Sequence, residues 1–188
     1  MANGTLKVQN IQTSSGSGTI TLGQSGETIA LGSGVTSKFN QPAFEANLSA
    51  NQSIADNTSV KVQFDTEVFD TDNCYDNSTN YRFTPTVAGK YYVYGQTFLQ
   101  GSGFTTLRQF TAQLYKNGSA VGYSQNNLND SEGYALTSTI SMVMDMNGSS
   151  DYAELYAYFN TNNSSAGTIE GHSTLSKTCF GAYRILGA

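Results

Sequence analysis

Apolar and polar residues alternate along most of this chain, in short runs separated by polar turns. From Pro42 onward the alternation has the two-residue period of β-strands, and no window repeats apolar residues at helical spacing over three turns. We therefore expect an all-β fold with almost no helix. The expected strands cover residues 42–47, 59–64, 67–69, 80–84, 89–99, 107–116, 134–144, 152–159 and 178–186.

The segment 75–94 is the most informative part of the pattern. Tyr81 and Phe83 alternate with polar neighbours, and Pro85 lacks the N–H that a strand would donate. Ala88-Gly89 then offers a reversal before a second aromatic run. The segment predicts two strands joined by a compact turn.

Two of the expected strands are aromatic or apolar on both alternating faces, at 91–99 and, nearly as completely, at 152–159. A strand of a solvated sandwich shows one polar face, so a strand that is apolar on both faces is expected to be covered on both. A second subunit would supply the missing cover. The alternative is that the tyrosine hydroxyls simply reach solvent.

The first forty residues differ from the rest, because they contain no Tyr and carry a short repeat. Thr-Ile-Thr-Leu-Gly at 19–23 recurs as Thr-Ile-Ala-Leu-Gly at 28–32. So few repeats cannot bury their own apolar side chains, so something else has to cover them. We expect residues 1–41 to form an attachment or stalk arm that uses Leu6, Val8, Ile20, Leu22, Ile29 and Leu31. Either three copies wrap one another in a β-rich stalk, or the arm adds to a larger assembly as a strand. A flexible Gly/Ser linker is the alternative.

Length and charge narrow the possible functions. A chain of 188 residues can bury a substantial core as one domain with a small appendage. The net charge of −5 and the scattered basic residues argue against binding nucleic acid through its phosphates. No apolar stretch approaches the ~20 residues of a membrane span. The first residues lack the features of a secretory signal, so we expect synthesis in a cytoplasm.

Candidate chemistry is sparse. His172 is the only histidine, so an imidazole metal cluster is impossible and a catalytic triad is not expected. Cys74 and Cys179 are too few for a disulfide framework, and free thiols are the default expectation. We expect no catalytic residues and no cofactor.

An acidic segment offers a weak candidate for calcium. Its carboxylates could supply oxygen ligands, although the spacing matches no known calcium loop and an acidic turn is usually just solvated. The candidate ligands are Asp65, Asp70 and Asp72.

A resemblance to a known family rests on the same central segment. The order Tyr-Asp, short polar turn, Phe-Thr-Pro and Gly-Lys-Tyr-Tyr within 75–92 resembles the signature of complement C1q-like and tumour necrosis factor-like jelly rolls. Similar elements stand at 42–46, 62–70, 114–118, 151–155 and 180–185. Ser149-Ser150 replace a glycine usual in the family, and the glycine of the last strand is displaced.

The resemblance implies a jelly-roll head over residues 42–188, assembly into a homotrimer, and a binding role without catalysis. Some members also hold calcium near the top of the trimer. On this basis we expect the trimer interface to include Phe44, Tyr81, Phe83, Tyr92, Tyr94, Phe180 and Tyr183.

A repetitive arm joined to such a head resembles the structural proteins of tailed bacteriophages. This likeness implies a virion protein, a short fibre or knob, whose arm attaches to a capsid or tail protein. A host-surface glycan or protein is a further expected partner, with the Asn-rich loops 126–129 and 160–165 suited to saccharides. The alternatives are a capsid decoration protein and a free bacterial C1q-like binding module.

Overall fold

The computed structural model describes residues 11, 20, 33, 41–103, 107–128 and 133–186, and those from 41 onward fall in one unit, Asn40–Ala188. The described residues contain thirteen strands and no helix, which confirms the expected all-β class. None of them therefore forms a helix that could cross a bilayer. The strands are β1 (Ala43–Asn47), β2 (Gln52–Ile54), β3 (Thr58–Lys61), β4 (Thr66–Asp70), β5 (Tyr75–Asp76), β6 (Arg82–Phe83), β7 (Gly89–Gln100), β8 (Leu107–Lys116), β9 (Ser119–Asn127), β10 (Ala135–Met146), β11 (Ala153–Thr161), β12 (Gly167–Ile169) and β13 (Cys179–Arg184).

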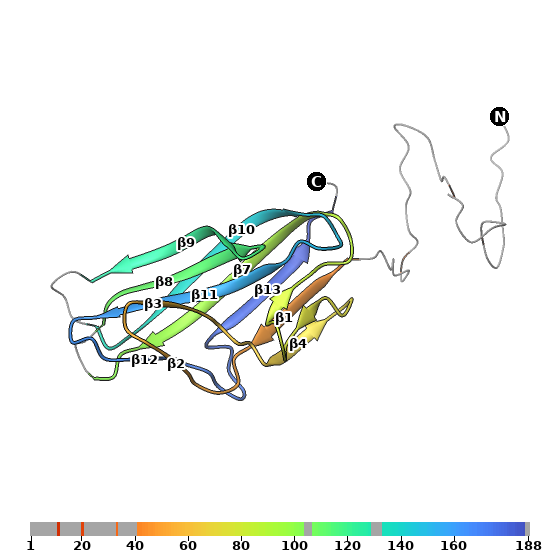
Figure 1. Ribbon diagram of the computed structural model, residues 1–188. Coiled ribbons are helices and arrows are strands. Elements are labelled where there is room, and N and C mark those ends of the chain that lie inside the picture. Colours follow the sequence, from red (N-terminus) through yellow and green to blue (C-terminus); the bar gives the residue numbers. More distant parts are fainter. Residues whose placement is uncertain are drawn as a thin grey trace. The chain divides into compact units, whose positions relative to one another are not determined.

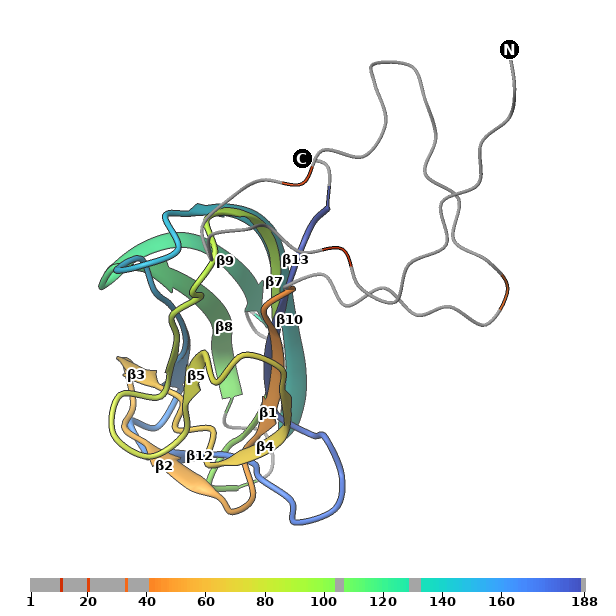
Figure 2. The same cartoon turned by 90° about the vertical axis from the view of Figure 1, so that its right-hand side faces the viewer.

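The strands form a two-layer antiparallel sandwich. One sheet has seven strands in the order β2-β12-β7-β13-β1-β4, with β10 also paired to β7. The other has six strands in the order β5-β6-β11-β8-β9, with β3 also paired to β11. Figure 1 shows β8, β9 and β11 lying over β7, β10 and β13, and Figure 2 separates the two curved layers. Each layer therefore has one face toward the core and one open face.

The core lies between the sheets and is rich in aromatic rings. In β7 every second residue from Tyr91 to Leu99 is buried, as the alternation of a strand requires. Phe44 of β1 stacks on Phe83 of β6 with 4.7 Å between ring centroids, so it joins the two layers. Phe180 of β13 meets Phe44 edge-on at 5.1 Å. These rings give the sandwich a continuous core.

The central segment differs from the expected hairpin. β6 lies in the six-stranded sheet and β7 in the seven-stranded sheet, so these two strands do not pair. The hairpin is formed instead by β5 and β6, in which Tyr75 is opposite Phe83. The chain then crosses between layers through buried Pro85, and the Tyr91 ring packs edge-on against Phe83 at 5.5 Å. The segment joins the two sheets.

Four strands were not expected from the sequence: β2, β5, β9 and β12. β9 pairs with β8 along its whole length through a turn at Asn117-Gly118, where φ is 51° and 76°. Two successive positive φ values define the turn that suits the twist of a two-residue hairpin. The turn was recognisable, but the polar strand after it lacks apolar alternation.

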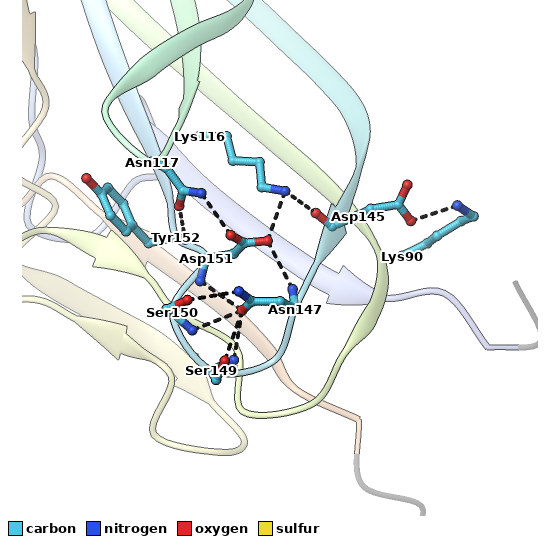
Figure 3. Close-up of polar contacts among 9 residues, drawn as sticks. All are labelled: Lys90, Lys116, Asn117, Asp145, Asn147, Ser149, Ser150, Asp151 and Tyr152. Atoms are coloured by element: carbon cyan, nitrogen blue, oxygen red, sulfur yellow. Dashed lines mark hydrogen bonds and ion pairs between the residues drawn. The ribbon is translucent and has the colours of Figure 1, made fainter.

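The loop between β10 and β11 is held by a polar network (Figure 3). The side-chain oxygen of Asn147 accepts hydrogen bonds from the N–H groups of residues 149, 150 and 151 at 2.9–3.0 Å. Asp151 in turn accepts from the Asn117 amide at 2.8 Å and pairs with Lys116 at 2.9 Å. These contacts hold the pKa of Asp151 below its ordinary value. They tie this loop to the β8–β9 turn.

Candidate functional site

The open face of the seven-stranded sheet carries a group of apolar and aromatic side chains, which we call the open aromatic face. Directly paired residues project to the same side of a sheet, so the register defines the group. One row runs from Val143 through Tyr92 to Tyr183. The next runs from Ser141 through Tyr94 and Gly181 to Glu45 and Phe69. The open aromatic face comprises Phe69, Tyr92, Tyr94, Val143 and Tyr183.

These side chains leave much of their surface in solvent. Val143 is 51% exposed, Tyr183 49% and Phe69 44%. The Tyr92 ring packs beside Tyr183 at 5.4 Å and beside Tyr94 at 6.2 Å. A shallow depression of about 330 Å³ adjoins them, lined by Tyr92, Tyr94, Gly95, Gln96, Thr139, Ile140, Ser141 and Cys179. An exposed surface of this kind is typical of a protein contact.

Tyr94 is held in place by a hydrogen bond. Its hydroxyl donates to Oε2 of Glu45, two strands away, at 2.6 Å. Burial and this hydrogen bond raise the pKa of Tyr94 above its ordinary value. The ring is therefore neutral and fixed on the sheet, and it offers a rigid apolar surface to a partner.

The structure corrects part of the expected interface. Phe44, Phe83 and Phe180 are fully buried between the sheets, and a side chain enclosed in its own subunit has no surface left for a partner. Tyr81 precedes β6 of the other sheet, and its backbone has a φ of 49°. Tyr92, Tyr94 and Tyr183 do lie together on one open face. The alternating sequence pattern shows which aromatic residues share one face of a strand, but it does not show whether that face lies toward the core or toward solvent.

Sequence reasoning missed two aliphatic or aromatic members of this face, Val143 and Phe69. Val143 stands in an alternating series with polar Thr139 and Ser141, all on the outward side of β10. That series was visible in the sequence. Phe69 lies on β4, the edge strand of the sheet, and only its pairing with Glu45 shows which side it faces.

The outward side chains of the second doubly apolar segment, β11, contact side chains of neighbouring strands in the same sheet. Tyr156 stacks on Tyr115 with 4.0 Å between centroids. Glu154 is buried and forms an ion pair with Lys61 of β3. β3 and β8 flank β11 within one sheet and do not form a second layer over it. The second cover that a partner subunit would supply stays a prediction here.

Of the six arm residues expected to attach, Ile20 is described and is 41% exposed. The other five lie outside the described residues: Leu6, Val8, Leu22, Ile29 and Leu31.

The carboxylates proposed as calcium ligands each accept hydrogen bonds from nearby groups of the protein. Asp65 accepts from the N–H of Ser49 at 2.9 Å, and although burial opposes the shift, such bonds lower the pKa of Asp65. Asp70 accepts from the N–H of Tyr75 at 2.8 Å, and Asp72 accepts from the Thr86 hydroxyl. Among the described residues no three His, Cys, Asp or Glu side chains form a group that could hold a metal ion.

The two cysteines and the histidine, the remaining candidates for chemistry, show no reactive arrangement among the described residues. The two cysteines carry free thiols, as expected. Burial raises the pKa of Cys179 to about 11 and that of Cys74 further, so neither is a reactive thiolate near neutral pH. Nδ1 of His172 accepts hydrogen bonds from the N–H groups of Thr174 and Leu175, both at 3.1 Å. The imidazole of His172 therefore stabilises the turn that follows it in the chain.

Comparison with known proteins gives a fold and no family assignment. The sequence matches no family model and no curated protein. Murine APRIL superimposes with a TM-score of 0.53 and 10% identity, over 78% of this chain and 100% of APRIL. An Eiger TNF from S. frugiperda gives 0.51 and 9%, over 79% of this chain and 93% of Eiger. The globular domain of zebrafish complement 1qA gives 0.49 and 14%, over 77% and 97%.

The protein is thus an all-β jelly roll of the C1q/TNF type, as the central segment predicted. Identities this low define a fold and leave the function to the surface chemistry of this chain.

Proposed function

We propose that the protein is a virion structural protein of a tailed bacteriophage, a homotrimeric short fibre or knob that projects from the particle and contacts the host surface. In this proposal residues 42–188 form the jelly-roll head. Residues 1–41 form the arm that joins it to a capsid or tail protein. The role is structural and binding rather than catalytic.

The open aromatic face is the observation that carries the proposal of self-association. Burying an aromatic or large aliphatic side chain contributes ~1.5–3 kcal/mol. A handful of such side chains from each subunit offsets the entropy lost on assembly. Tyr92 and Tyr94 are already packed in fixed positions, so little further ordering is needed. The common trimeric state of C1q-like proteins supports three copies rather than two.

The attachment role of the arm is supported by its sequence. Its repeats of Ile and Leu between glycines are too short to cover themselves, so they suit addition to another β-rich surface. A head that assembles and an arm that attaches are the two parts a projecting virion protein needs. A capsid decoration protein would share both parts and differ in its distribution over the particle.

Measuring the mass of the assembly tests the proposal. One chain has a mass of 20.1 kDa. Sedimentation equilibrium of the full chain at micromolar concentration should give three times this mass. A fragment that begins at Pro42 should keep the same state, because the open aromatic face lies wholly within it. A monomeric full chain would exclude the trimer.

Particle incorporation tests the arm separately. The full chain should copurify with phage particles, whereas the fragment from Pro42 should be absent from them. Electron micrographs of labelled particles distinguish the two virion roles, since a fibre occupies few sites and a decoration protein covers the shell. Incorporation of the armless fragment would contradict the role given to residues 1–41.

A further inference from the structure

The open face of the six-stranded sheet carries a groove with a different chemistry, which we call the amide groove. It has a volume of about 320 Å³. Its lining residues include no Lys, Arg, Asp or Glu and no aliphatic side chain. They are Ser59, Gln109, Thr111, Gln113, Tyr123, Gln125 and Tyr158.

Strand register assembles this lining from four strands. Ser59 of β3 is opposite Tyr158 of β11, which is opposite Thr111 of β8, which is opposite Gln125 of β9. The next row places Gln113 opposite Tyr123. Since paired residues project to the same side, these side chains share the outward face of the sheet. The groove is therefore built on regular strands rather than on loops.

Several polar groups in the groove remain available for a ligand. The side-chain amides of Gln109 and Gln125 have no hydrogen-bond partner among the described residues. Gln113 uses its carbonyl oxygen to accept from the Ser59 hydroxyl at 3.1 Å, which leaves its NH₂ group to donate. Each amide offers both a donor and an acceptor, the combination that pairs with neighbouring hydroxyl groups.

Tyrosine rings supply the apolar part of the groove. Tyr123 is 70% exposed, the largest fraction among the large hydrophobic side chains of the described residues. Tyr158 donates its hydroxyl to the Asn57 side chain at 2.6 Å, which fixes its ring. An aromatic face beside hydrogen-bonding groups suits a ligand that has both apolar C–H faces and hydroxyl edges.

We propose that the amide groove binds a neutral oligosaccharide. The absence of ionic side chains from the lining disfavours acidic sugars, phosphates and charged peptides, whose charges would be left unpaired. On β3 and β11, which both contribute to the groove, Lys61 and Glu154 form an ion pair with each other. The proposal gives a chemistry to the host-surface contact in the proposed function. The groove lies on the layer opposite the open aromatic face, so its test is independent of the oligomeric state.

The test is binding of the full chain to an array of neutral, sialylated and sulfated oligosaccharides. Binding should favour neutral glycans built from hexose or N-acetylhexosamine units. Calorimetry with the strongest neutral binder should show an affinity that changes little between low and high salt, because no charges pair. Tyr123→Ala and Gln125→Ala should each weaken binding by about tenfold, the effect of losing roughly 1.4 kcal/mol.

Two matched variants separate the groove from general effects. Tyr123→Phe keeps the ring and should retain most of the affinity. Val121→Ala alters an exposed residue of the same strand outside the groove and should leave binding unchanged. Thermal unfolding verifies that each variant is folded. The proposal is overturned if no neutral glycan binds, if only charged glycans bind, or if binding survives both Tyr123→Ala and Gln125→Ala unchanged.

Discussion

Gly181 allows the Tyr94 ring to lie across β13 and reach Glu45. A Cβ atom at position 181 would stand 2.4 Å from Cζ and from the hydroxyl oxygen of Tyr94, much closer than atoms can pack. The residue opposite Tyr94 in the register must therefore be glycine if the ring is to keep this position. The shape of the open aromatic face depends on this one missing side chain.

We expect Gly181→Ala to destabilise the protein by about 1–3 kcal/mol, because the Tyr94 ring must move and lose its hydrogen bond to Glu45. Urea denaturation at one protein concentration measures the free energy of unfolding. In a Tyr94→Ala background the same Gly181→Ala change should cost little, because nothing remains to clash. Equal costs in the two backgrounds would show that the ring is not the obstacle.

Among the elements, the β5–β6 hairpin depends on one carboxylate. Oδ1 of Asp76 accepts from the N–H groups of Ser78 and Thr79 at 3.1 and 2.9 Å, and Oδ2 accepts from the N–H of Asn80 at 3.1 Å. The bond from Thr79 is the largest influence that lowers the pKa of Asp76 well below its ordinary value. The turn is therefore organised around a charged side chain.

The lowered pKa of Asp76 predicts sensitivity to acid. The pKa of Asp76 in the folded state lies below the ordinary 3.8. Under acid conditions the unfolded chain therefore binds more protons than the folded chain, and the free energy of unfolding decreases as the pH is lowered. We expect the thermal midpoint to fall from about pH 5 downward, and Asp76→Asn to reduce this fall. Differential scanning calorimetry across this range measures it.

Glu67→Gln is the control for that experiment. Glu67 is an exposed carboxylate of β4 with no hydrogen bond to another described residue, so its variant should follow the acid profile of the unmodified protein. If the thermal midpoints of the Asp76→Asn and Glu67→Gln variants change with pH in parallel, the turn is not the source of the acid sensitivity.

The whole head presents two open faces with different chemistry on its opposite layers. The open aromatic face gathers aliphatic and aromatic side chains on the seven-stranded sheet, and the amide groove gathers amides, hydroxyls and tyrosine rings on the six-stranded sheet. Such a division allows one face to be covered by sister subunits while the other meets a ligand. The two proposals thus concern separate surfaces.

Two exposed valines provide a matched test of this division. Val143 is 51% exposed on β10 and Val121 is 43% exposed on β9, in opposite layers. We expect Val143→Arg to dissociate the assembly into folded monomers, since it would bury an unpaired charge at the interface. Val121→Arg should leave the assembly intact. Sedimentation velocity and far-ultraviolet circular dichroism measure mass and folding together.

Thermal unfolding gives a second readout of the same prediction. The midpoint of an assembled protein rises with protein concentration, whereas that of a monomer does not. The unmodified chain and the Val121→Arg variant should show this dependence, and the Val143→Arg variant should lose it. A concentration-dependent midpoint in Val143→Arg would place the subunit contact elsewhere.

The strand content was predictable where apolar alternation is strong. The long strands β7, β8, β10 and β11 match the expected ranges closely, because alternate apolar side chains along most of each strand pack into or against the core. β9 was missed because its inward positions include Gly122 and Ser124, which carry no apolar signal. Its partner strand and the Asn117-Gly118 turn hold it in the sheet.

By itself, the sequence determined that the protein is all-β and where its main strands run, because a two-residue period is a local property of the chain. Tertiary structure decided which aromatic rings are enclosed and which stay open. Phe83 and Tyr92 both belong to aromatic runs near the centre of the chain, yet the first is buried and the second lies on an open face. The difference arises because the chain changes layers between them, and which face of a strand is inward depends on the sheet it joins.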